Sequence, residues 1–486
     1  MQSVLIASSE AVPFVKSGGL GEVTGTLPRE LRLQGVDARL ILPCYHDISA
    51  PYRSRMQTMA TFTVTVGWRK QPCTILSLVE DGVPCYFVDN EYYFQRPGLY
   101  GHYDDGERFA FFCRSVLEGL PHLDFSPQVI HCHDWHTAMI CPLLKTSYQE
   151  TPFYRDMKTL YTVHNLKYQG IFPKETLGEL WGLGWEEFTP ERLEFYDQVN
   201  CMKGGLIYSD AVSTVSRTYL QEIQQPHSGE RLEGVVVQRR SQLYGITNGI
   251  DSDDYDPAAD PALLVNYDSS NWHKKRQNKE GLQEQLGLTV AYEKPLIAIV
   301  SRLVEPKGLD LVAHVLYELM SDDIQLVVIG AGEAQYEHMF QVAAWLYPEK
   351  MAYRADYDDW LARRMFAAAD LLLMPSRFEP CGLSQLFAMR YGCLPIVRET
   401  GGLKETVIPF DQYAGEGNGF SFTDYNAHDM LHTIRYALTV YHNDKSNWEL
   451  LVKNAMQSDN SWHNAACEYA GLYQQLAPEG ENICVQ

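Results

Sequence analysis

Short apolar runs alternate with helical patterns along most of the chain. In the first half, each apolar run has the length of a buried strand and is followed by turn or helix signals: Val4–Ser8, Arg39–Pro43, Val129–Cys132, Thr159–Val163, Ala211–Val215 and Leu243–Ile246. Strands that alternate with helices predict parallel sheets built from βαβ units. A helix is expected from about Val23 to Gln34, and the runs Thr61–Val66 and Cys85–Val88 predict an additional β element.

The same pattern starts again after a polar, turn-rich segment at Gly249–Ser270. A fully apolar strand is expected at Pro295–Ser301, and a helical pattern covers about Trp462–Leu476. The further strands of this half are expected at Gln325–Gly330, Leu371–Pro375 and Leu394–Arg398. We therefore predict an α/β chain with two domains in tandem, hinged near residue 250. In open parallel sheets, ligands bind beyond the carboxyl ends of the strands, so a site is expected in the loops that follow them.

Composition narrows the possible partners. The 486 residues suit two or three domains, and 40 Lys and Arg against 62 Asp and Glu give a formal net charge of −22. This charge argues against a protein that coats nucleic acid or an anionic membrane, since phosphate contacts need a basic face. It leaves room for a small cationic pocket.

Other features of the sequence predict where the protein is located and whether it binds a metal. No run of 18 apolar residues predicts a membrane span, and the N-terminus is typical of a buried strand rather than a signal peptide. Eleven cysteines without a regular framework indicate reduced thiols and a cytoplasmic protein. His131, Cys132, His133 and His136 are metal-ligand types, but no second Cys pair stands at zinc-finger spacing, so we predict no metal site.

Three loops of the first half carry candidate chemistry. The loop Lys16–Gly21 combines glycines with a lysine, which lets backbone N–H groups and an ammonium approach an anion. Its spacing fits neither a dinucleotide fingerprint nor a Walker loop, and a plain tight turn is the alternative. The loops Ile130–His136 and Thr162–Leu166 place polar groups directly after apolar strands, which favours a functional site.

The second half offers groups suited to phosphate. Arg302 and Lys307 follow the first strand of this half, and a guanidinium together with an ammonium suits a diphosphate. Glu379 stands in the loop Pro375–Ser384, which opens a helix that is expected to run to about Tyr391. The backbone N–H groups at such a helix start can hold phosphate. Glu399–Lys404 forms a similar loop.

The order and spacing of these motifs resemble the bacterial and plastid glycogen (starch) synthases over nearly the whole length. The motifs are Lys16-Ser-Gly-Gly-Leu-Gly21, His133-Asp-Trp-His136, Thr162-Val-His-Asn165, Gly245-Ile-Thr-Asn-Gly-Ile-Asp251, Ser301-Arg-Leu303, Glu305-Pro-Lys-Gly308 and Pro375-Ser-Arg-Phe-Glu-Pro-Cys-Gly-Leu383. The resemblance implies two Rossmann-like domains of GT-B type that face each other across a deep cleft. Residues 1–248 would form the acceptor-glucan domain and 249–461 the sugar-nucleotide domain. Residues 462–486 would form a helix that returns to the N-terminal domain.

The activity implied is a retaining glucosyl transfer. Glucose would pass from ADP-glucose to the non-reducing end of an α-1,4-glucan such as glycogen or a maltooligosaccharide, without a cofactor or metal. UDP-glucose as the preferred donor is the alternative. The resemblance leaves the oligomeric state open.

The resemblance also assigns roles to individual residues. Arg302 and Lys307 match residues that hold the diphosphate, and Glu379 matches the residue that binds the donor glucose hydroxyls. His164 would lie at the reacting face of the sugar, and Asp134 would belong to the acceptor side. The remaining substrate-binding positions are Lys16, Gly18, Gly19, Tyr100, Asn248, Tyr357, Cys381, Gly382, Leu383, Ser384, Thr400 and Gly401.

Three positions depart from the family pattern. Glu22 replaces the usual Asp after the glycine loop, Ser384 replaces a common Thr, and Phe387 stands where wider retaining relatives carry a second Glu. Retaining glycosidases use two carboxylates about 5–5.5 Å apart. The sequence offers no obvious pair, so we predict a same-face displacement in which the leaving phosphate takes the acceptor proton.

Other classes of protein fit less well. A dinucleotide oxidoreductase would need a different glycine spacing and an acidic residue at the end of the second strand. A glucan phosphorylase would need a lysine that binds pyridoxal phosphate. A carbohydrate-binding protein without activity remains an alternative, although all the expected polar positions are present.

Overall fold

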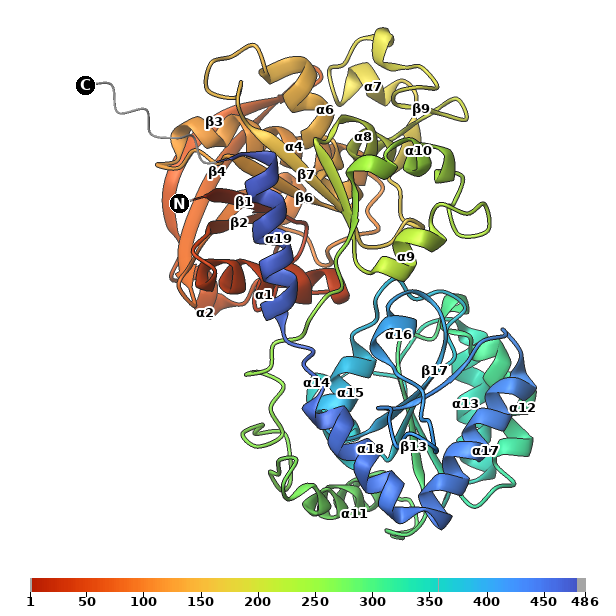
Figure 1. The fold of residues 1–486 in the computed structure, drawn as a ribbon. Coiled ribbons are helices and arrows are strands. Elements are labelled where there is room, and N and C mark those ends of the chain that lie inside the picture. The colour runs from red at the N-terminus through yellow and green to blue at the C-terminus, as the bar shows by residue number, and fades with distance from the viewer. Residues whose placement is uncertain (1, 357, 479–486) are drawn as a thin grey trace. The chain divides into compact units, whose positions relative to one another are not determined.

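The protein forms two compact α/β units in the computed structural model, which describes residues 2–356 and 358–478 (Figure 1). The first unit contains the chain up to Asn248 together with the segment that begins at Trp462. The second unit is Gly249–Ser461. The predicted fold class, α/β with parallel sheets in two domains, is confirmed.

The first unit is built on a nine-stranded sheet in the order β12-β11-β7-β6-β1-β2-β5-β4-β3. From β12 to β5 neighbouring strands are parallel, and β4 and β3 continue the sheet antiparallel. The strands are β1 (Ser3–Ala7), β2 (Asp37–Pro43), β3 (Gln57–Val66), β4 (Arg69–Glu80), β5 (Val83–Asp89), β6 (Val129–His133), β7 (Lys158–Val163), β11 (Ala211–Thr214) and β12 (Leu243–Gly245).

Helices cover this sheet, and the predicted first helix begins earlier than expected, directly at the glycine loop. The helices are α1 (Gly19–Leu33), α2 (Ala50–Arg53), α3 (Glu91–Phe94), α4 (Asp105–Gly119), α5 (Trp135–Ala138), α6 (Ile140–Leu143), α7 (Thr176–Glu179), α8 (Cys201–Tyr208), α9 (Arg217–Glu222), α10 (Glu233–Gln238) and α19 (Trp462–Leu476). A small antiparallel sheet adds β8 (Ile171–Pro173), β9 (Glu194–Phe195) and β10 (Gln198–Asn200).

The last described helix, α19, belongs to the first unit and packs against α1 (Figure 1). Its inner face is apolar and buried, and Tyr473 places its hydroxyl 2.7 Å from Nδ1 of the buried His131 on β6. Gln2 donates a hydrogen bond to the carbonyl of Ala477. The helix therefore contributes to the core of a unit whose other elements lie more than 200 residues earlier in the chain.

The second unit has a six-stranded sheet, parallel throughout, in the order β15-β14-β13-β16-β17-β18. Its strands are β13 (Leu296–Val300), β14 (Gln325–Ile329), β15 (Met351–Arg354), β16 (Leu371–Met374), β17 (Leu394–Arg398) and β18 (Phe420–Phe422). Its helices are α11 (Lys275–Leu286), α12 (Leu309–Leu319), α13 (Ala334–Leu346), α14 (Asp359–Ala368), α15 (Ser384–Arg390), α16 (Gly401–Thr406), α17 (Ala427–Asn443) and α18 (Lys445–Gln457).

In both sheets, the order in which the chain adds strands reverses near the centre. In the first unit the chain runs outward from β1 through β2 on one side, while β6, β7, β11 and β12 extend the other side. In the second unit, β13 and β16 stand at the equivalent place. Ligands of open α/β sheets bind at such switch points, beyond the carboxyl ends of the strands. The loops after β1, β6, β13 and β16 are therefore the expected places for a site.

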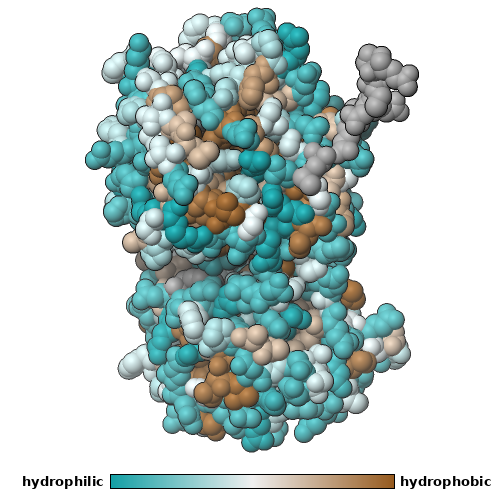
Figure 2. Space-filling model, turned by 90° about the vertical axis from the view of Figure 1, so that its left-hand side faces the viewer, coloured by the Kyte–Doolittle hydropathy of each residue, from teal (hydrophilic) through white to brown (hydrophobic). Residues whose placement is uncertain are grey.

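The face of the molecule drawn in Figure 2 is mainly polar. Figure 2 shows one face, on which hydrophilic residues predominate and hydrophobic side chains gather in small separate patches. Among the described residues, no helix combines the length and apolar character needed to cross a membrane.

Candidate functional site

The switch point of the second unit brings an ammonium and a carboxylate together. Lys307, in the loop after β13, places Nζ 2.6 Å from Oε2 of Glu379, in the loop after β16. Ser376 donates a hydrogen bond of 3.1 Å to the same carboxylate oxygen. Glu379 is only 8% exposed, so this ion pair is screened little by solvent. Two residues 72 positions apart thus form one charged pair.

Glycines allow the backbone around this pair to approach closely. Gly308 has φ +71, and a Cβ there would lie 1.9 Å from the carbonyl oxygen of Pro375. Gly401, at the start of α16, has φ +44, and a Cβ there would lie 2.0 Å from the carbonyl oxygen of Glu379. Side chains are excluded at both positions by backbone atoms, which do not move aside easily. The Glu379 loop is therefore held from two sides.

This packing gives a first prediction. Gly401→Ala is expected to destabilise the second unit by about 1–3 kcal/mol, because the left-handed backbone and the Glu379 carbonyl both oppose a Cβ. Urea unfolding and initial transfer rates would measure the loss. Gly471→Ala is the control, since nothing lies within 4 Å of its Cβ and it sits in α19, where alanine is neutral or slightly stabilising. Wild-type stability and rate in Gly401→Ala would contradict this account.

Arg302 lies close in sequence to the ion pair and keeps an exposed guanidinium. Within the described part of the chain it makes no ion pair and no side-chain hydrogen bond. Cys381 is buried in the same loop as Glu379, and Gly382 and Leu383 follow it and lead into α15 at Ser384. Thr400 directly precedes α16. Tyr357, one of the predicted substrate-binding positions, lies outside the described residues. The second unit thus gathers cations and helix starts suited to an anion.

In the first unit, Asp134 follows β6 with φ +55, a conformation uncommon outside glycine. Its Oδ1 accepts a hydrogen bond of 2.8 Å from the backbone N–H of His164, which follows the neighbouring strand β7. Burial raises the pKa of Asp134 to about 7, although the amides of His164 and Asn165 oppose this shift. Asp134 and His164, both predicted as site residues, are therefore in direct contact. The Asp134 carboxyl can exchange a proton near neutral pH.

Imidazoles that are buried or, for His164, partly buried contact one another next to Asp134 in the chain and in the neighbouring strand. Nδ1 of His133 is 2.9 Å from Nε2 of His164, and the His131 ring packs on His133 with centroids 4.0 Å apart. Burial lowers the pKa of His164 and of His136 to about 3, and it lowers the pKa of His131 and His133 well below the usual range. At neutral pH, His164 is thus an uncharged imidazole that can donate or accept a hydrogen bond.

Tyr100 contacts other site elements of this unit, and Asn248 is a second buried polar residue among the predicted positions. The Tyr100 hydroxyl is 2.7 Å from Oγ of Ser9, in the loop after β1, and its ring stacks on His136 at 4.6 Å. Oδ1 of Asn248 is buried and has no hydrogen-bond partner among the described atoms. An unsatisfied buried acceptor of this kind suits a ligand hydroxyl.

A carboxylate that was not predicted from the sequence contacts the glycine loop. Glu10, three residues after the end of β1, accepts hydrogen bonds from the backbone N–H and the hydroxyl of Ser17. Lys16 forms an ion pair of 2.8 Å with Glu22, and Gly18 and Gly19 open α1. A lone acid after a strand gives no periodic signal, so only its position at a switch point could have indicated Glu10.

Within the described part of the chain, the cluster of histidines shows no metal-binding arrangement. Across residues 2–356 and 358–478, no group of three or more His, Cys, Asp or Glu side chains has an arrangement that could hold a metal ion. Cys132 and the neighbouring His131 and His133 are fully buried in the sheet.

Comparisons with known proteins identify the family to which the chain is similar. The model "Starch synthase catalytic domain" matches residues 3–238, and "Glycosyl transferases group 1" matches 287–449. A glycogen synthase from Desulforamulus reducens is 51% identical over 478 residues, covering 98% of this chain and 99% of that protein. One from Clostridium acetobutylicum is 52% identical over 474 residues, covering 97% and 99%. The chain belongs to the glycogen synthase family.

The glycogen synthase family resemblance extends to a solved structure. The catalytic domain of starch synthase IV from Arabidopsis thaliana, described as bound to ADP and acarbose, matches with a TM-score of 0.92 at 32% identity. The match covers 98% of this chain and 99% of that chain. The predicted family is confirmed, and the protein is a glycosyltransferase of glycogen or starch synthesis with the GT-B fold.

Proposed function

We propose that the protein transfers glucose from ADP-glucose to the non-reducing end of an α-1,4-glucan with retention of configuration. The observation that carries this proposal is the Lys307–Glu379 pair at the switch point of the second unit, with Arg302 in the same loop after β13 as Lys307. The ADP described for the starch synthase IV structure supports an adenine nucleotide as the leaving group.

The charges suit the bond that breaks. As the C1–O bond to the diphosphate lengthens, negative charge grows on phosphate oxygen and positive charge on the sugar ring. Lys307 stabilises the phosphate charge from a position that its ion pair with Glu379 sets before reaction, and Arg302 adds a second positive charge. Glu379 accepts hydrogen bonds from donor hydroxyls and orients Lys307 through the ion pair. Its role is to position the sugar.

The acceptor attacks on the face from which the diphosphate leaves. The C1–O bond to phosphate breaks, the bond from C1 to the acceptor O4 forms, and the O4 proton passes to the leaving phosphate oxygen. His164, as a neutral imidazole, donates a hydrogen bond to the sugar, and Asp134 fixes the His164 backbone. The reaction is proposed to need no cofactor or metal, since the two cations carry the charge stabilisation. Activity is therefore expected to survive EDTA.

Nucleotide release tests the proposal. ADP-glucose and UDP-glucose are each mixed with protein and glycogen, and free nucleoside diphosphate is measured over time. A higher kcat/KM is expected with ADP-glucose, and NMR of the newly added residue is expected to show an α anomeric proton. A higher kcat/KM with UDP-glucose would overturn the donor assignment. Glycogen binding without any nucleotide release would identify a carbohydrate-binding protein.

A further inference from the structure

A second ion pair joins the same two loops that carry Lys307 and Glu379. Arg377, in the loop after β16, places Nε 3.1 Å from Oε1 of Glu305, in the loop after β13. Glu305 and Lys307 are the two ends of one short 3-10 helix, Glu305–Lys307. We propose that Arg377 is a positioning residue, which sets the place of the Lys307 ammonium by holding this 3-10 helix. The inference rests on the proposed function for the role of Lys307.

Arg377 holds both the backbone and a side chain of this 3-10 helix. The backbone N–H of Arg377 donates a hydrogen bond of 3.0 Å to the carbonyl of Pro306, the middle residue of the helix. Together with the ion pair to Glu305, this contact fixes the two residues directly before the ammonium. The ammonium of Lys307 then meets Glu379, which stands two positions beyond Arg377. A shift of the Arg377 side chain is therefore passed on to Lys307.

Two further side chains hold the guanidinium of Arg377 in place. It lies over the ring of Tyr425, with Cζ 4.5 Å from the centroid, and its Nη2 is 3.5 Å from Oδ2 of Asp310 in α12. The Tyr425 hydroxyl donates a hydrogen bond to Oδ1 of the same Asp310. A planar guanidinium can pair with carboxylates and stack on a ring at the same time, which an ammonium cannot do in this geometry. These contacts leave the Arg377 side chain few other positions.

Arg398, at the end of β17, supports the backbone of the loop that contains Arg377. It donates hydrogen bonds of 2.8 Å to the carbonyl of Ser376 and of 2.5 Å to the carbonyl of Arg377. The Ser376 hydroxyl in turn donates to the Glu379 carboxylate. The neighbouring strand thus fixes the loop that carries Glu379, and Arg377 ties the loop that carries Lys307 to it.

Folding stability alone does not account for this ion pair. The side chains of Arg377 and Glu305 are 52% and 45% exposed, and ion pairs this exposed contribute little to the free energy of unfolding. An alignment role differs, because the effect of a charge on a developing anion depends strongly on its place. A displacement of about 1 Å can cost about 10²-fold in rate. Loss of the Arg377 side chain is therefore expected to affect the reaction more than the fold.

A double-mutant cycle tests whether Arg377 acts through Lys307. Arg377→Met is expected to lower kcat about tenfold, with a smaller change in the KM for ADP-glucose and a urea midpoint near that of wild type. In a Lys307→Met background, the same substitution is expected to lower kcat less than about twofold, because the ammonium that it displaces is absent. Arg377→Lys keeps the charge without the planar group, so its kcat is expected to fall between those of wild type and Arg377→Met.

Arg435→Met is the matched control. It removes an arginine of α17, also in the second unit, that forms exposed ion pairs of 2.9 Å with Glu318 and 3.0 Å with Asp322. Its kcat is expected to match that of the parent protein in both backgrounds. A wild-type kcat in Arg377→Met would overturn the inference. So would a tenfold loss that persists unchanged in the Lys307→Met background, since Arg377 would then act independently of the ammonium.

Binding of ADP separates this inference from the proposed function. The terminal phosphate of ADP carries the charge that develops when the donor bond breaks, so the Kd of ADP, measured by calorimetry without acceptor, reports the place of the ammonium. Arg377→Met is expected to raise this Kd several-fold in the wild-type background and to leave it unchanged in the Lys307→Met background. If the protein binds ADP with this pattern but transfers no glucose, the proposed function fails and the inference stands. If transfer occurs and Arg377→Met changes neither its rate nor the Kd, the inference fails and the function stands.

Discussion

Lys307→Met is expected to lower kcat about 10²–10³-fold, the loss seen when one preorganised group is removed from a developing anion. Methionine keeps most of the volume and removes the charge. The ammonium stands 2.6 Å from Glu379 and, in the proposed reaction, stabilises the leaving diphosphate. Steady-state ADP release at saturating donor measures the effect. Because the charge acts mainly in the transition state, kcat is expected to change more than the KM for donor.

Two companion variants show whether charge or structure is responsible. Lys294→Met removes a lysine of the same unit that forms a 2.7 Å ion pair with Asp323, and its rate is expected to match wild type. Lys307→Arg restores a positive charge and is expected to recover part of the rate. An unchanged kcat in Lys307→Met, or a loss of equal size in Lys294→Met, would show that this charge has no part in the reaction.

Acid is expected to unfold the first unit steeply below about pH 6.5. His131, His133 and His136 are buried and His164 is partly buried, and desolvation lowers the pKa of each, so all four are uncharged in the folded protein at neutral pH. In the unfolded chain they bind protons below about pH 6.5. Their contribution to stability is therefore present above that pH and is lost as pH falls toward their folded pKa values.

The shifted pKa of Asp134 has the opposite effect on the pH dependence of stability. Its pKa is raised to about 7 in the folded state, so between about pH 4 and pH 7 the folded protein holds a proton that the unfolded chain has released. These five groups together take up about three protons on unfolding near pH 5, which corresponds to about 4 kcal/mol per pH unit. Urea midpoints at pH 7, 6 and 5 measure the slope.

A substitution checks the assignment to buried histidines. His136→Phe replaces an imidazole that packs among aromatic rings and is expected to reduce the uptake by about one proton. His227→Gln changes an exposed histidine and is expected to leave the slope near that of wild type. A first unit equally stable at pH 7 and pH 5 would contradict the protonation argument.

Apart from β15, which was missed, the sequence predicted most of the parallel strands, because such strands are buried on both faces and consist of apolar runs. β4 was missed for the opposite reason. Its residues Arg69–Glu80 include Lys, Gln, Pro and Ser, since an antiparallel strand near the sheet edge has one side toward solvent. The short strands β8–β10 and β18 have too few residues to show a period.

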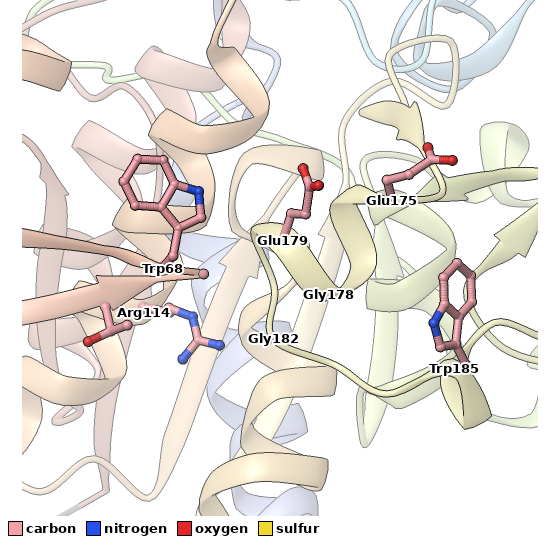
Figure 3. A pocket seen from close by; sticks show the side chains of 9 residues that line it. Trp68, Arg114, Glu175, Gly178, Glu179, Gly182 and Trp185 are labelled. Carbon is pink, nitrogen blue, oxygen red and sulfur yellow. The ribbon is translucent and has the colours of Figure 1, made fainter.

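The residues of the candidate site could be predicted from the sequence, but the contacts between them could not. Lys307 and Glu379 each follow an apolar strand, which marked them as candidates. Their 2.6 Å contact depends on β13 and β16 being neighbours in the sheet. Local sequence patterns do not predict the order of strands in a sheet. The same limit applies to Trp68 and Trp185, which line one cavity although they are far apart in the chain (Figure 3).

The return of α19 has a consequence for synthesis. The second unit is continuous, whereas the first is interrupted by all of Gly249–Ser461. At about 5–20 residues per second, roughly 10–40 s pass between translation of Asn248 and of α19. During that interval the face of α1 that later packs on α19 stays uncovered, and His131 lacks the Tyr473 hydroxyl. The domain translated first is thus completed last, and nascent chains expose its unfinished face to chaperones and proteases.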